Sequence, residues 1–150
     1  IYYSAIHGAV IRKADMDKYG KDPASLADKM IGAQKGAIQV NIAKQQIKNV
    51  PEAELDNNHS QIKELGTLPD LIMEVKNNKI EAVIAELPVA NPDLAVAEYS
   101  FTDDAGGSSV AVKKNSPDLV EAINKTIARL QAEDKISEFV GEANMLADAQ

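Results

Sequence analysis

A glycine turn between a predicted strand and a predicted helix is the first place where this sequence could do chemistry. Residues 34–38 read QKGAI, with Gly36 at the turn. The first backbone N–H groups of a helix have no partner inside the helix and attract anions. The Walker pattern, in which a second glycine is followed by Lys and Ser or Thr, is absent, and so is GxGxxG. A nucleotide phosphate is therefore disfavoured, while an ordinary turn and a site for another anion both stay open.

Glu86 is the second residue with candidate chemistry. It follows the apolar run Ala82–Ala85, which predicts a central strand, and precedes Pro88. Open α/β sheets bind ligands at the carboxyl ends of their strands. A carboxylate in that position must be solvated or paired, and it is well placed to receive a ligand ammonium. The alternative is an exposed glutamate that is stabilised by a helix dipole.

Groups for catalysis or metal binding are sparse. His7 and His59 are the only histidines, and cysteine is absent, which removes disulfides and thiolate chemistry. The HExxH pattern of zinc peptidases and the GxSxG nucleophile elbow are also absent. An isolated histidine is more often a surface or strand residue than a ligand. We therefore predict no catalytic residue, no metal site and no cofactor.

Charge and composition narrow the class of protein further. The 150 residues carry 16 Lys and Arg against 23 Asp and Glu, so the formal net charge is -7. Nucleic-acid grooves and anionic membrane surfaces are bound through clustered positive charge, and both are disfavoured here. No apolar run approaches the roughly 20 residues of a membrane helix. A hydrophobic content of 45% is ordinary for a globular chain with one core.

Strand and helix patterns alternate through the first hundred residues, and they must position both candidate groups. Four short apolar runs predict strands, and helices are expected after Gly36 and from an N-cap at Thr67. A fifth strand is predicted at Ser108–Lys114, which ends in a basic pair as the first strand does. The first four strands are Ile6–Lys13, Lys29–Ala33, Gln61–Leu65 and Ala82–Ala85. We predict a three-layer αβα fold with a mostly parallel five-stranded sheet.

The last 35 residues have a different pattern. Ser116 and Pro117 are typical of a helix start, and a second, shorter helix is expected to follow. Apolar residues recur on one face of the first helix, at Leu119, Ile123, Ile127 and Leu130. Since the first hundred residues already account for a complete layered fold, these helices are expected to pack against a sheet outside this chain. We expect the chain to be a processed or excised piece of a longer protein.

Four segments, in this order, resemble the second half of the amino-acid-type extracellular solute-binding proteins that feed ATP-driven importers. They are YY...GAVIRK, LADKMIGAQKGAIQ, LPDLIMEVKNNKIEAVIAELP and GSSVAVKKNSPDLVEAINKTIARLQAEDKISEF. The resemblance covers nearly the whole chain and implies a type II periplasmic-binding-protein fold, with two lobes joined by hinge strands. It implies hinge regions at residues 1–12 and 107–114, a second lobe at residues 13–106, and C-terminal helices at residues 115–150 that pack on the first lobe.

The same resemblance implies a ligand site. Gln34 would face the ligand through its side chain, and the backbone N–H groups of Gly36, Ala37 and Ile38 would approach its α-carboxylate. Many members have Ser or Thr where this chain has Ala37, so a hydroxyl donor is missing here. Glu86 matches the acidic residue that binds the α-ammonium. The arginine that usually grips the α-carboxylate belongs to the first lobe, which is not among these residues.

The function implied by the resemblance is the binding of a polar L-amino acid, such as glutamine or glutamate, for a membrane permease. The location would be extracellular or periplasmic, with a lipid anchor or fused segment outside this chain. Exposed hinge strands and C-terminal helices give a reason for a homodimer. Two alternatives stay open: a dehydratase of the same fold, with Glu86 as the one visible acid, and an effector-binding domain of a transcription regulator.

Overall fold

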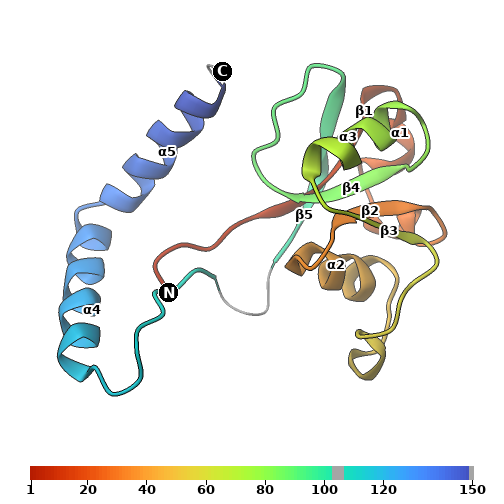
Figure 1. The fold of residues 1–150 in the computed structure, drawn as a ribbon. Coiled ribbons are helices and arrows are strands. Elements are labelled where there is room, and N and C mark those ends of the chain that lie inside the picture. The colour runs from red at the N-terminus through yellow and green to blue at the C-terminus, as the bar shows by residue number, and fades with distance from the viewer. Residues whose placement is uncertain (103–106, 149–150) are drawn as a thin grey trace. The chain divides into compact units, whose positions relative to one another are not determined.

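The computed structural model describes residues 1–102 and 107–148. These residues form two compact units, each of which is considered by itself: residues 6–102, and residues 1–5 together with residues 107–148 (Figure 1). The segment predicted as the first hinge region is divided between the two units. The predicted lobe boundary at residue 106 lies outside the described residues.

A five-stranded sheet forms the centre of the larger unit (Figure 1). Its strands lie in the order β3-β2-β4-β1-β5, so the first strand of the chain is next to the edge strand β5 and also pairs with β4. The bounds of the strands are β1 His7–Arg12, β2 Ile31–Gln34, β3 Ile62–Leu65, β4 Ala82–Glu86 and β5 Leu94–Phe101.

The prediction of a mostly parallel sheet is wrong, because the sheet is mixed. β2 pairs in parallel with β3 and with β4, whereas β1 pairs antiparallel with both β4 and β5. The physical reason lies in where the chain enters the sheet. β1 is inserted between two strands that come much later in the chain, and it runs against both of them. The alternation of strands and helices along the sequence carries no information about that insertion.

The predicted strand at Ser108–Lys114 is also wrong. Ser108 forms an isolated antiparallel bridge with Tyr3, and no strand covers the rest of that segment. The fifth strand is β5 instead, which the sequence analysis did not identify. β5 pairs with the full length of β1, with a register shift between Gly8 and Val10. Because β4 pairs with one side of β1, β5 occupies the other side.

Helices cover both faces of this sheet, as predicted, and Thr67 is confirmed as the N-cap of α3, since its side chain accepts a hydrogen bond from the Asp70 N–H. The longer helical segment after Gly36 begins as α2 and continues as a π-helical turn, Ala43–Ile47. The helices are α1 Met16–Tyr19, α2 Ile38–Ile42 and α3 Leu68–Lys76 in this unit, with 3-10 turns at Lys13–Asp15, Pro23–Leu26 and Glu52–Glu54.

Two apolar clusters fill the space between the sheet and its helices. On the α2 face, Ile11 and Ile84 of the sheet pack in one cluster with Ile42 and Ile47 of the helical segment. On the α3 face, Val83 packs in a second cluster with neighbours that include Leu71, Val75 and Ile80. Successive strand residues point to opposite faces, so membership of a cluster tells which face a strand residue occupies.

The smaller unit contains α4, Pro117–Ala132, and α5, Lys135–Asp148. Pro117 stands at the start of α4 as predicted, and Asp134, with a φ of 55°, connects the two helices. No residue of α4 is buried. Large apolar side chains are exposed in this unit, among them Leu119, Phe139, Met145 and Leu146. None of the helices in the described ranges has the length and apolarity needed to cross a bilayer.

Candidate ligand-binding site

The strand ends that carry Gln34 and Glu86 lie at the same edge of the sheet. β2 and β4 are parallel neighbours, with Ile31 opposite Ala82 and Gly32 opposite Val83. Gln34 is the last residue of β2, and Glu86 is the last residue of β4. Because parallel neighbours end at one edge, the structure brings together the two segments that the sequence analysis selected.

The glycine turn after β2 leaves backbone donors open at this edge. Gly36 has a φ of +73°, a left-handed backbone conformation that glycine adopts without steric cost, and it turns the chain into α2. Ala37 is the N-cap of α2, and its N–H donates to the Gln34 carbonyl at 3.1 Å. Within the described part of the chain, no hydrogen bond engages the N–H groups of Ile38 and Gln39. Of the predicted donors, the Ala37 N–H is therefore engaged within the turn, while the Ile38 N–H stays open together with that of Gln39.

Glu86 points to the same face of the sheet as α2. Two residues earlier, Ile84 belongs to the apolar cluster on the α2 face, and the period of two in a strand places Glu86 on that face as well. Its side chain is exposed, and no hydrogen bond or ion pair within the described residues occupies its carboxylate. An open carboxylate and open helix-start amides therefore share one edge and one face.

His7 and Gln39 lie beside these groups and were not among the predicted site residues. His7 is the cross-strand partner of Glu86 and is only 3% exposed. The Gln39 Nε2 lies 3.4 Å from the His7 Nδ1, while the Gln39 Oε1 is buried without a partner. Buried polar atoms of this kind are normally hydrogen bonded, so the Gln39 Oε1 is an exception beside the site. No local pattern marks the pair, because 32 residues separate its members.

Gln34 is partly engaged within the protein. Its Nε2 donates to the Gly66 carbonyl at 3.2 Å, which ties the end of β2 to the residue before Thr67, the N-cap of α3. The side chain stays exposed at the site edge. Gln34 can therefore hold the turn in place and still present its amide oxygen to a ligand.

The arrangement suits binding of a zwitterion better than catalysis or metal coordination. A helix start attracts an anion, and a carboxylate on the neighbouring strand attracts a cation. No group of three His, Cys, Asp or Glu side chains able to hold a metal ion occurs among residues 1–102 and 107–148. His59 accepts a hydrogen bond from the Gln61 N–H through its own Nδ1, and it has a local structural role in the turn before β3.

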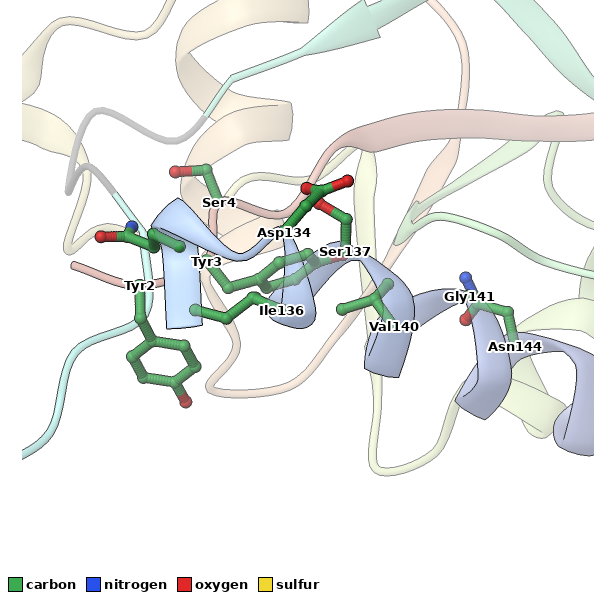
Figure 2. Close-up of a pocket in the computed structure, with 10 residues that line it drawn as sticks. Tyr2, Tyr3, Ser4, Asp134, Ile136, Ser137, Val140, Gly141 and Asn144 are labelled. Carbon is green, nitrogen blue, oxygen red and sulfur yellow. The ribbon is translucent and has the colours of Figure 1, made fainter. Parts of the chain in front are cut away.

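The described part of the smaller unit has three hollows, and two of them are lined by residues of α5. One, of about 490 Å³, has a mixed lining that includes the polar residues Ser4, Asp134 and Ser137 and the apolar residues Ile136 and Val140. Figure 2 shows Tyr3 and Ser4 of the amino-terminal segment beside Ile136 and Ser137 at the start of α5. The other hollow, of about 450 Å³, is apolar and lies between the helices and the amino-terminal segment; its lining includes Tyr2, Val110, Ile127, Leu130, Phe139 and Val140.

Comparison with known proteins gives one curated relative and several solved structures. No family model matches the chain. A probable histidine-binding protein from Campylobacter jejuni is 37% identical over 109 residues, which are 68% of this chain and 38% of the relative. An amino acid ABC transporter substrate-binding protein from Streptococcus pneumoniae, solved with bound L-arginine, is 34% identical, with a TM-score of 0.70, over 91% of this chain and 56% of the other.

A third similarity shows the fold alone. An ancestral amino acid-binding protein, described as a precursor of cyclohexadienyl dehydratase, is 18% identical, with a TM-score of 0.64, over 89% of this chain and 54% of the other. In all three comparisons this chain spans about half the length of the matched protein, or less.

Proposed function

Because this chain belongs to the family of amino acid ABC transporter solute-binding proteins, we propose that it forms the second lobe and C-terminal helices of such a protein and holds one side of an amino acid. One observation carries the proposal: the open Glu86 carboxylate and the open N–H groups of Ile38 and Gln39 lie at the same edge and on the same face of the sheet. An amino acid presents an ammonium and a carboxylate a short distance apart. The protein carboxylate is complementary to the ammonium, and the helix-start amides are complementary to the ligand carboxylate.

The ligand that we favour has a cationic or imidazole side chain. The curated relative is named for histidine, and the solved relative from Streptococcus pneumoniae holds L-arginine. A net charge of -7 favours encounter with a cation through the field of the whole molecule. The glutamine or glutamate preference expected from the sequence has no support in the names of these two relatives.

Location and partners follow from the family as proposals. Binding proteins of this kind work outside the cell or in the periplasm and deliver ligand to a membrane permease, and we propose the same for this one. Its anchor to the membrane would lie outside these residues. The apolar surface of α4 and α5 would be covered by a first lobe, which would also supply the remaining ligand contacts.

A dehydratase activity has support only at the level of the fold. The relative that connects to a dehydratase is 18% identical, which speaks for shared architecture and not for shared chemistry. Glu86 would have to act as a general acid while its carboxylate is needed for the ligand ammonium. Nothing in the described residues favours a regulator of transcription over a binding protein.

Half a site should bind weakly. Charged hydrogen bonds contribute about 1.5 to 3 kcal/mol each when they are shielded from water, but one lobe cannot enclose the ligand. The entropy cost of association then leaves a dissociation constant of about a millimolar or weaker for the 150 residues alone. Submicromolar binding of any amino acid to this chain in calorimetry would contradict the division of the site between two lobes.

The experiment is a titration of the isotope-labelled chain, followed by NMR, with L-arginine, L-histidine and L-glutamine. We expect amide shifts at Ile38, Gln39 and Glu86, largest with arginine or histidine. Glu86→Gln should abolish them, since it removes the charge that meets the ammonium. Glu52→Gln, an exposed carboxylate in the 3-10 turn Glu52–Glu54, is the matched control and should leave them unchanged. Shifts that persist in Glu86→Gln would refute the assigned role.

A further inference from the structure

Two lysines on the helical segment that supplies the site amides are held in an uncommon way. Lys44 is only 4% exposed, and its Nζ donates to the Leu55 carbonyl at 2.6 Å and to the Asn57 carbonyl at 2.9 Å. Its ammonium has no ion-pair partner within the described residues. Buried lysines are rare unless they are paired with an acid. Here backbone carbonyls replace the acid, which fixes the chain segments that carry them.

Lys48 makes the more extensive set of contacts. Its Nζ donates to the carbonyls of Leu26 and Ala27, each at 3.0 Å, and to the carbonyl of Lys29. The Gln61 Oε1 is a fourth acceptor, 3.5 Å from the same nitrogen. Burial is the main cause that lowers the pKa of Lys48 from its ordinary value, with the charges of Asp28 and Glu81 opposing it. The ammonium is thus partly withdrawn from water and solvated by the protein backbone.

The acceptors of Lys48 belong to the segments that lead into the sheet. Residues 26–29 are separated from β2 by Met30 alone, and Gln61 immediately precedes β3. Gln61 joins these segments, because its Nε2 donates to the Asp28 carbonyl and its own carbonyl accepts from the Ile31 N–H. Lys48 therefore connects the end of the helical segment to the beginning of the two strands beside it.

The π-helical turn explains how both lysines reach their acceptors. Over Ala43–Ile47 the helix widens, and the Lys48 N–H donates to the Ala43 carbonyl five residues earlier. The Val50 N–H then donates to the Lys44 carbonyl at 2.9 Å. π-Helical turns are uncommon and occur often near functional sites. Here the turn directs two cations toward loops at the end of the segment away from the ligand site.

At the other end of the segment, Val40 and Ile42 of α2 are buried, at 7% and 3% exposed, whereas the turn that precedes them is open. Gly36 has a positive φ, and a Cβ placed on it would meet no atom within 4 Å. Ile38, the first residue of α2, is 36% exposed. A helix that is joined to its strand through an open glycine can tilt about that joint unless its far end is fixed. Lys48 lies ten residues beyond Ile38, a distance of about 15 Å at the helical rise, so it cannot reach a ligand bound at the first turn.

We propose that Lys48, supported by Lys44, is a positioning residue of the ligand site: by holding the far end of the α2 segment on backbone carbonyls, it sets the direction of the amides at the near end. This inference deepens the proposed function and rests on it only for the identity of the ligand. The orientation of the turn is a property of the chain itself and can be measured without any ligand.

The test compares Lys48→Met, which keeps most of the length of the side chain and removes its donors, with Lys76→Met. Lys76 is a lysine of the same unit whose Nζ is paired with Asp93 at its surface, so it is the matched control. Hydrogen exchange is measured by NMR at the amides of Ala37 and Val40, both of which are hydrogen bonded at the turn. Val10, which is buried in β1 between β4 and β5, reports opening of the whole unit.

We expect Lys48→Met to accelerate exchange at Ala37 and Val40 about tenfold relative to Val10, because the turn then opens locally. Lys76→Met should leave that ratio unchanged, and Lys48→Arg, which keeps the charge and several donors, should restore most of the protection. Equal acceleration at all three amides would overturn the proposal, since it would mean general loss of stability. Failure of both Lys48→Met and Lys48→Gln to fold would overturn it for the same reason.

A second readout separates this inference from the proposed function. Titration with L-arginine should give weaker amide shifts at Ile38 in Lys48→Met than in the unaltered chain at equal ligand concentration. If the unaltered chain shows no shifts with any amino acid, the proposed function fails while the exchange result stands. If arginine binds equally to both proteins, the positioning role is excluded.

Discussion

Gly36 and Glu86 show how much of the candidate site depends on single residues. Gly36 provides a left-handed turn that aims α2 at the sheet edge, and Glu86 provides a charge at the end of the neighbouring strand. Both were selected from the sequence by their positions at strand ends. The amide and imidazole of Gln39 and His7 add polar atoms that complete the surroundings of Glu86. The site is therefore made from groups that each have a simple chemical role.

Replacing Gly36 isolates the cost of its backbone conformation. Gly36→Ala should lower the free energy of unfolding by about 1 kcal/mol, because a φ of +73° strains an L side chain although no atom would clash with the new methyl group. Gly66 is the matched control, since its surroundings are equally open and its φ is not in the left-handed region. Urea unfolding of both variants measures the difference. An equal effect of the two substitutions would show that the turn is unstrained.

Among the elements, β5 is the one that holds α1 against the sheet. The Tyr99 hydroxyl donates to the Tyr19 carbonyl at 2.8 Å, and the Glu98 N–H donates to the Gly20 carbonyl at 2.7 Å. The Tyr99 ring also meets the Phe101 ring edge to face, with centroids 5.5 Å apart. Because β5 in turn pairs with β1, these contacts support the strand that carries His7 at its start.

The role of Tyr99 in holding α1 can be tested through the pH dependence of stability. Burial raises the pKa of Tyr99 to about 12, with Asp22 contributing, from 10.0. The neutral phenol is therefore favoured in the folded state. Tyr99 contributes fully to the free energy of unfolding below pH 10, and this contribution is lost as the pH rises toward 12. Tyr99→Phe should be less stable by about 1 kcal/mol at neutral pH and should show a smaller loss between these pH values. Identical alkaline profiles of the two proteins, measured by urea unfolding, would contradict the assignment.

In the whole molecule, the two units differ in how their apolar residues are covered. The larger unit buries apolar side chains on both faces of its sheet. The helices of the smaller unit leave Leu119 and Phe139 half exposed and Met145 two-thirds exposed. Exposed apolar surface of this extent marks an interface. In the complete binding protein that we propose, the first lobe would cover it.

The 150-residue chain by itself should therefore self-associate. We expect light scattering after size-exclusion chromatography to give a mass above 16.1 kDa that rises with concentration. Phe139→Ser together with Leu146→Ser should shift the chain toward the monomer, because it removes two of the exposed apolar groups of α5. Met73→Ser, an exposed apolar residue on α3 of the other unit, is the control and should leave the distribution unchanged. A monomer at all concentrations would sink the idea of an uncovered interface.

Patterns in the sequence were enough to predict α2 to α5, four of the five strands and the two segments of the candidate site, but not the short helix α1. These features depend on local signals: the period of apolar residues, the N-cap at Thr67, the proline at the start of α4, a glycine at a strand end, and an acid before a proline. Such signals act over a few residues, so they can be read without knowing what the segment will contact.

The neighbours of each strand, and the side chains that complete the site, are known only from the folded chain. The placement of β1 between β4 and β5, the selection of Leu94–Phe101 over Ser108–Lys114 as the fifth strand, and the contact of Gln39 with His7 all join residues far apart in the chain. Pairing of this kind is chosen by the packing of the whole core and by competition for each sheet position, and no short stretch of sequence encodes that competition.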